Sequence, residues 1–181
     1  MIRTPLSLAL AAALCGVPGA AAAQNAASDT VMVEVENSAG EDAGTAEFEQ
    51  LRHGLLVRLR LTNLTEGGHG VHLHETGACS PDLKAAGSHY NPLGSAHGFD
   101  AKGGYHVGAL TNVFAGADGI AKADIFVPQV SLHGPENDRY PFTLKDDDGT
   151  ALMIHADEDD YVSMSSAGAR EACGVVFAPE G

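Results

Sequence analysis

The chain has 181 residues, of which 44% are hydrophobic, and its 24 acidic residues outnumber its 10 basic residues to give a net charge of −14. This length fits one domain with a substantial core. A strongly acidic surface disfavours nucleic acid and anionic lipid as partners, and we expect the protein to bind neither.

The first 23 residues have the pattern of a secretory signal peptide. Arg3 supplies a basic start, residues 6–14 form an apolar run too short to span a bilayer, and residues 21–23 form an A-x-A cleavage site. No later segment is apolar enough to insert in a membrane. We predict a signal peptide over 1–23 and one domain over 24–181, located in the periplasm or secreted.

The remainder of the chain alternates apolar and polar residues with a period of two, which is typical of strands. Turns rich in Gly, Asn, Asp and Pro separate the runs, and no stretch has an apolar stripe at helical period. The runs are 30–36, 43–50, 55–61, 119–127, 150–156 and 173–178. Short strands with frequent turns predict an all-β fold, an antiparallel sandwich or barrel.

The thirty residues of segment 76–105 lack this alternation of apolar and polar residues. An irregular segment of this length is uncommon in a compact domain unless it has a function. It contains Cys79, His89 and His97, and His106 follows directly. We therefore expect the chemistry of the protein to lie here.

Five of the nine histidines fall between positions 72 and 106. His72 and His74 stand two residues apart in "GVHLHE", so in a strand both would point to one face. His155 ends the apolar run "TALMIH" and precedes the acidic "ADEDD". An exposed histidine-rich loop is one interpretation. A metal site is the other, and an all-imidazole ligand set suits copper or zinc.

Two cysteines lie outside the leader, Cys79 and Cys173. Their spacing excludes a CxxC metal or redox motif, and export to an oxidising compartment makes a disulfide the default.

Six motifs together resemble the copper/zinc superoxide dismutase family of exported bacterial type, from about Val31 to the C-terminus. They are, in the family's order, "GVHLHE", "AGSHYNP", "AHG", "HVG", "IHADEDD" and "AREACGVV". The resemblance implies a Greek-key β-sandwich or barrel of about eight antiparallel strands, with long metal-binding and electrostatic loops. It also implies copper as cofactor and superoxide as substrate. A homodimer is a separate expectation that the sequence itself does not decide.

The same resemblance assigns the copper site. His72, His74 and His155 match copper ligands, and His89 in "AGSHYNP" matches the histidine that lies between copper and zinc. Arg170 matches the arginine that attracts superoxide beside the copper. Arg170 and His89 are therefore the predicted catalytic residues.

The zinc site departs from the family pattern. His89, His97 and His106 match zinc ligands, but Ala109 stands where the family has an aspartate. A methyl group cannot bind a metal, and structural zinc almost always has four ligands. Asp100, in "HGFDAKGG", and a water are the two candidates for the fourth ligand. A weak or unoccupied zinc site is the alternative.

The resemblance assigns three further roles. Asp159 matches the carboxylate that links a copper histidine to a zinc histidine, and Cys79 with Cys173 matches the family disulfide. The histidines that match no ligand are expected at the surface or in turns; they are His53, His69 and His133.

Two functions fit this ligand set. The first is a superoxide dismutase that converts superoxide to dioxygen and hydrogen peroxide at a histidine-ligated copper. The second is a secreted copper-binding or copper-buffering protein with little or no turnover. The absence of a zinc ligand at Ala109 is compatible with this second function. Arg170 and Asp159 favour the enzyme, because a metal store needs neither residue.

Overall fold

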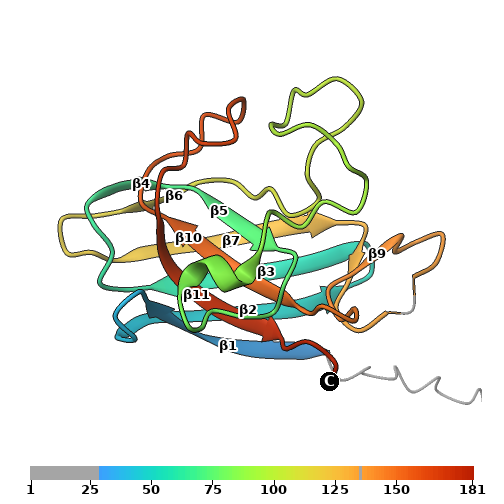
Figure 1. The fold of residues 1–181 in the computed structure, drawn as a ribbon, viewed down its shortest axis with the longest axis horizontal. Coiled ribbons are helices and arrows are strands. Elements are labelled where there is room, and N and C mark those ends of the chain that lie inside the picture. Colours follow the sequence, from blue (N-terminus) through green and yellow to red (C-terminus); the bar gives the residue numbers. More distant parts are fainter. Residues whose placement is uncertain (1–28, 135) are drawn as a thin grey trace, which may run out of the picture.

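The computed structural model describes residues 29–134 and 136–181. The predicted signal peptide, 1–23, lies outside the described residues. The domain is built almost entirely from strands, with one short 3-10 helix (Figure 1). Its elements are β1 (Thr30–Asn37), β2 (Asp42–Leu51), β3 (Gly54–Leu61), β4 (Gly67–His69), β5 (Val71–His74), η1 (Leu83–Ala86), β6 (Val113–Ala115), β7 (Ala121–Pro128), β8 (Val130–Ser131), β9 (Phe142–Thr143), β10 (Thr150–His155) and β11 (Arg170–Phe177).

Seven strands form one curled sheet in the order β5-β10-β11-β1-β2-β3-β7, and all of its neighbouring pairs are antiparallel. The chain crosses from β3, near one edge of this sheet, to β4 and β5 at the other edge. β6 then pairs with β4 and leads directly into β7, which pairs with β3. The two edges are thereby brought together, and the predicted all-β Greek-key barrel is confirmed.

The period-two pattern explains how the strands form the core. In β3 the side chains of Leu55, Val57, Leu59 and Leu61 are completely buried. Arg58 lies on the opposite face, where its guanidinium forms ion pairs with carboxylates of the adjacent strand β2. The apolar face of each strand therefore points into one shared core, which provides most of the folding free energy.

Two long connections project from the same side of the barrel (Figure 1). One joins β5 to β6 over residues 75–112, and the other joins β10 to β11 over residues 156–169. β5 and β10 are antiparallel neighbours, so the two connections leave opposite ends of this pair. The first then folds back along β5, where His89 bridges His74, and the second passes the start of β5, where the Asp157 carbonyl accepts from the Gly70 amide. The barrel thus brings the two loop segments that contain most of the predicted site residues to one place.

A disulfide between Cys79 and Cys173 fastens the first connection to β11, as the sequence predicted. The two cysteines are 94 residues apart, and closing a loop of this size stabilises a fold by roughly 4–5 kcal/mol in the chain-entropy model. Within the described residues, no helix has the length and apolar character needed to cross a membrane.

Candidate metal centre

His72 and His74 lie on the face of β5 that points away from the barrel core. Val71 and Leu73, on the other face, belong to the core cluster. The two histidines are nonetheless buried, with exposed fractions of 0% and 1%, because the long connections cover them. A polar outer face is thus excluded for this pair.

The neighbouring elements add two more imidazoles. β10 pairs with β5 and ends at His155. The loop after β5 returns along its free edge, where His89 forms an antiparallel bridge with His74. The ring of His89 stacks on that of His72 with centroids 4.0 Å apart. The four histidines each offer a nitrogen within 4.8 Å of the others, so they could hold one metal ion.

The free nitrogens of this cluster fit a metal ion. His72 Nδ1, His74 Nε2 and His155 Nε2 are buried and have no hydrogen-bond partner. Buried polar atoms without partners are costly and rare, so three that converge fit the ligand atoms of a cation-binding site. The opposite nitrogens are held in place: His74 Nδ1 donates to the Gly87 carbonyl at 3.1 Å. Such contacts fix which nitrogen faces a metal.

Burial also keeps these rings neutral. Desolvation, followed by the charge of neighbouring groups, lowers the pKa of His72 to about 4 and that of His74 to about 3. The same causes lower the pKa of His89 to about 2. A neutral imidazole has a lone pair to donate, so all three are ready to bind a metal at neutral pH.

A second cluster adjoins the first through His89. The nitrogens of His89, His97 and His106 lie within 4.8 Å of one another, and His97 Nδ1 is buried with no partner. Among the described residues no carboxylate completes this cluster, and Asp100 is exposed and outside it. These residues fit a metal with three nitrogen donors, one ligand fewer than a structural zinc site normally has.

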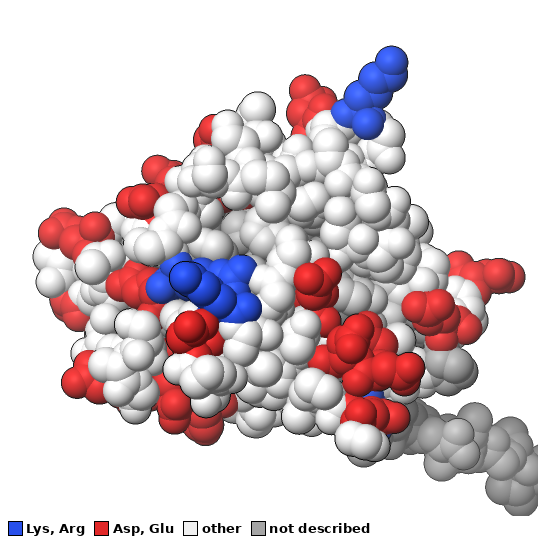
Figure 2. Space-filling view, in the orientation of Figure 1, with Lys and Arg blue, Asp and Glu red and all other residues white. Residues whose placement is uncertain are grey.

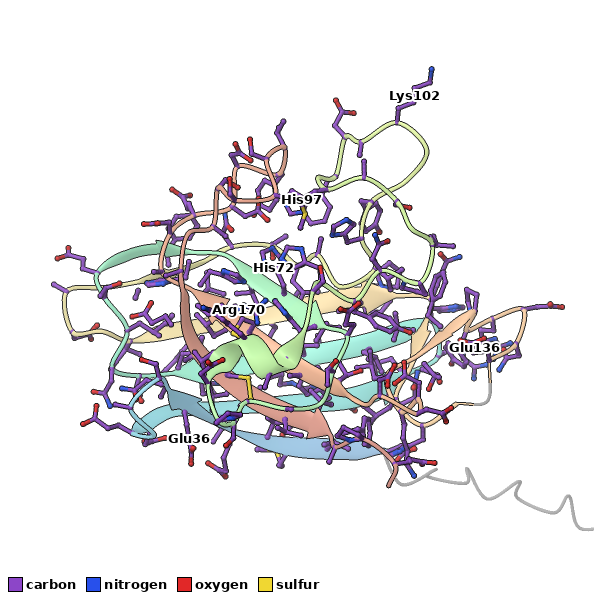
Figure 3. All side chains as sticks on the ribbon, viewed as in Figure 1. Glu36, His72, His97, Lys102, Glu136 and Arg170 are labelled. Carbon is purple, nitrogen blue, oxygen red and sulfur yellow. A yellow bond between two sulfur atoms is a disulfide. The ribbon has the colours of Figure 1, made fainter. Side chains whose placement is uncertain are left out.

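Asp159 joins the two clusters. Its carboxylate accepts a hydrogen bond from His72 Nε2 at 2.7 Å and another from His97 Nε2 at 3.0 Å. In Figure 3 His72 and His97 lie one above the other, at the base of the two long connections. The two clusters therefore share one histidine, His89, and are linked through one carboxylate.

Comparison of the sequence with known protein families identifies the family to which this chain belongs. The family described as copper/zinc superoxide dismutase matches residues 42–176. The chain belongs to the copper/zinc superoxide dismutase family.

Individual members of the family support this assignment. A superoxide dismutase [Cu-Zn] of Caulobacter vibrioides is 41% identical over 141 residues, which cover 76% of this chain and 79% of that protein. The crystal structure of a superoxide dismutase-like protein of Bacillus subtilis has a TM-score of 0.72 at 34% identity and covers 81% of this chain and 97% of that chain. The Cu/Zn superoxide dismutase of Brucella abortus has a TM-score of 0.65 at 27% identity, covering 82% and 100% respectively.

Arg170 begins β11 beside His155, its partner in the β10–β11 register. Its guanidinium donates to the carbonyl oxygens of Leu83, at 2.6 Å, and of Gly87. Burial lowers the pKa of Arg170, yet an arginine remains charged at neutral pH. A surface hollow is lined by Arg170, Lys84 and Asp82, and Figure 2 shows a compact blue patch in this region with red acidic side chains beside it.

Sequence reasoning did not anticipate two features. His69 was expected at the surface or in a turn, but it lies in β4 and is fully buried. Its ring nitrogens contact the carbonyl oxygens of His155, at 2.7 Å, and Thr65, at 2.8 Å. The Gly87 carbonyl, which contacts both His74 and Arg170, was also missed. The role of a backbone carbonyl cannot be predicted from the residue type. The burial of His69 could have been predicted, because His69 directly precedes the buried strand in "HGVHLH".

Proposed function

We propose that this protein is an exported superoxide dismutase whose copper is held by His72, His74, His89 and His155. The observation that carries the proposal is the convergence of three buried, partnerless nitrogens beside His89. When bound, copper supplies the alternating one-electron oxidation and reduction that convert two superoxide ions and two protons to dioxygen and hydrogen peroxide. The chain supplies the ligands, the orientation and the electrostatics.

Arg170 attracts and positions the substrate. Superoxide is an anion, and the chain carries a net charge of −14, so a local cation is needed to draw the substrate in. The two carbonyl contacts hold the guanidinium beside His155 while leaving it at a surface hollow. The disulfide fastens the loop that contributes these carbonyls to β11, and so limits the movement of Arg170.

His89 belongs to both clusters. Its Nδ1 lies 3.2 Å from His106 Nδ1, and its ring stacks on His72. A neutral imidazole carries one proton, and the partner at each ring nitrogen decides where that proton resides. We therefore propose that His89 is the group through which occupancy of the three-histidine cluster affects the copper site.

Zinc is the proposed occupant of the three-histidine cluster, held by His89, His97 and His106 more weakly than is usual in the family. Ala109 removes both a bond and a negative charge that would compensate a divalent cation. A copper-buffering protein is the second candidate function, and this incomplete site is what favours it. The exposed, basic hollow at Arg170 favours the enzyme, because a metal store has no need of an anion site.

We also propose that the protein is exported from the cytoplasm. A signal peptide over 1–23, cleaved near Ala23, would release a single domain over 24–181 to the periplasm or the exterior. The disulfide agrees with this location, since such bridges persist in oxidising compartments. A homodimer is a further prediction that sedimentation analysis of the purified protein tests.

The decisive experiment compares dismutase activity and copper content in three copper-loaded proteins: the unmodified protein, His74→Ala and His133→Ala. His133 is an exposed histidine paired with Asp29, so its removal is a matched control. We expect the unmodified protein and His133→Ala to bind one copper and to be active, and His74→Ala to lose both properties. Stoichiometric copper without turnover would favour the buffering function, and unchanged copper in His74→Ala would refute the ligand assignment.

A further inference from the structure

His69 contacts two carbonyl oxygens, one with each of its ring nitrogens. Nδ1 lies 2.7 Å from the His155 carbonyl at the end of β10, and Nε2 lies 2.8 Å from the Thr65 carbonyl in the segment before β4. The residue is fully buried. A carbonyl oxygen only accepts hydrogen bonds, so both contacts are hydrogen bonds only when each nitrogen carries a proton. The geometry indicates a ring that donates on both sides and has a positive charge.

Glu171 supplies the opposite charge. Its Oε2 lies 3.0 Å from His69 Nδ1, and its Oε1 accepts a hydrogen bond from the Thr65 amide at 3.1 Å. Only 17% of the Glu171 side chain is exposed, and Oε2 is buried with no hydrogen-bond partner. A buried carboxylate oxygen of this kind is costly unless a positive charge compensates it. The His69 ring provides that charge, and the two side chains form a buried ion pair.

The ion pair lies where β10 and β11 shift in register. Ile154 lies opposite Ala172, but the next residue of β10, His155, lies opposite Arg170. Glu171 is therefore an extra residue with no partner across the two strands, as in a β-bulge. Bulges bend a strand and re-aim the neighbouring side chain, and they are common beside active sites. How this bulge is held thus decides where Arg170 lies relative to His155.

We propose that Glu171, acting through His69, is a positioning residue of the dismutase site. The ion pair holds the bulge of β11 against the backbone of His155, and so fixes Arg170 relative to this copper ligand. The proposal rests on the proposed function, which assigns copper to His155 and the attraction of superoxide to Arg170. Glu171 is not a metal ligand and acts through the residues that it holds.

The charge of Glu171 and its positioning role predict opposite effects on the rate. A carboxylate next to Arg170 repels superoxide, so the electrostatic effect alone would make Glu171→Gln faster. If the pair positions the site, Glu171→Gln is slower, because the His69 ring loses its counter-charge and the bulge is free to move. We expect kcat/KM and copper affinity each to fall about tenfold, the lower end of the range for groups that orient metal ligands.

The test compares copper-loaded Glu171→Gln with copper-loaded Glu66→Gln. Glu66 is an exposed acidic residue next to Thr65, so this control removes the same charge nearby. The measurements are the dismutation rate, the copper affinity in chelator competition and the electron paramagnetic resonance spectrum of copper(II). We expect Glu171→Gln to lose rate and affinity and to change the spectrum, and Glu66→Gln to match the unmodified protein.

A double variant separates positioning from stability. His69→Leu with Glu171→Leu removes both charges together, and replacing a buried ion pair by apolar residues is often neutral for stability. We expect the free energy of unfolding of this variant to return toward that of the unmodified protein, while its rate and copper spectrum stay altered. Recovery of all three properties would show that the pair contributes stability alone, and would overturn the proposal.

The charge on His69 is measured in the unmodified, copper(I)-loaded protein, which is diamagnetic. Nitrogen-15 NMR should find a proton on both ring nitrogens of His69, and a ring with one proton would overturn the ion pair. A rate that is unchanged or raised in Glu171→Gln would overturn the positioning role while leaving the proposed function intact. An unmodified protein that binds copper without turnover would refute the proposed function alone, because the copper spectrum and affinity of the variants still test this inference.

Discussion

His72 and His97, which belong to different metal clusters, donate to the two oxygens of one carboxylate. Asp159 accepts from His72 Nε2 at 2.7 Å and from His97 Nε2 at 3.0 Å. Because an ionised carboxylate only accepts, both rings must carry a proton on Nε2, and in a neutral ring this leaves the Nδ1 lone pair free. Those Nδ1 atoms are the buried ones without partners.

Burial acts to raise the pKa of Asp159, but hydrogen bonds from His97, the Tyr161 amide and His72 outweigh it and hold the pKa well below its usual range. The carboxylate therefore stays ionised and keeps both rings in the same tautomer. One side chain thus prepares a ligand nitrogen in each cluster.

The first prediction follows from this tautomer control. Asp159→Asn places an amide N–H₂ donor against one of two Nε2–H donors, so one ring must change tautomer or turn away. We expect metal affinity at one of the two sites to fall about 10- to 100-fold. Chelator competition for copper and zinc measures this, and Asp160→Asn, whose carboxylate is exposed and contacts neither ring, is the control. Unaltered affinity for both metals would show that Asp159 has no such role.

The second prediction concerns Arg170. Arg170→Glu should lower the dismutation rate by at least tenfold, leave the copper content intact and weaken the dependence of the rate on ionic strength, because the attracting charge is reversed. Arg139→Glu makes the same change of charge in an exposed turn and should change the rate little. Initial rates measured over a range of salt concentrations distinguish the two. Full activity in Arg170→Glu would remove this residue from the mechanism.

The third prediction concerns the disulfide between Cys79 and Cys173. Thiol titration of the unreduced, denatured protein lacking its leader should find no free thiol. Cys79→Ser with Cys173→Ser should lower the free energy of unfolding by about 2–5 kcal/mol. It should also reduce activity more than copper content, because the loop that positions Arg170 is released. A doubly substituted protein as stable as the original would contradict this.

The fourth prediction concerns the metal-free protein in acid. The pKa values of His72 and His74 are lowered to about 4 and about 3, whereas an unfolded histidine titrates near 6.5. Between these values the unfolded chain binds more protons, so stability falls as the pH drops below about 6.5. Each such histidine contributes up to about 1.4 kcal/mol per pH unit.

Urea unfolding of chelator-treated protein between pH 8 and pH 4.5 measures this dependence. His74→Gln removes one titrating ring and should give a shallower slope. Stability that stays constant from pH 8 to pH 5 would show that the buried histidines titrate normally.

Local alternation in the sequence was sufficient to predict the long strands, but it did not predict the short strands β4, β6, β8 and β9. The alternation in β3 separates Leu55 and Leu59 from Arg58 whatever the neighbouring strands are. The spacing of His72 and His74 places both on one face for the same reason. Cys79 and Cys173 are the only cysteines outside the predicted leader, and the disulfide predicted between them is present.

Only the tertiary structure decided which distant groups meet. The sequence does not show that Ala109 would lie opposite His72, that one carbonyl at Gly87 would contact both His74 and Arg170, or that His69 would be buried. These contacts depend on the path of long loops around a closed barrel. A residue's own chemistry determines what it can bind, but the entropy and packing of the whole chain determine what comes within its reach.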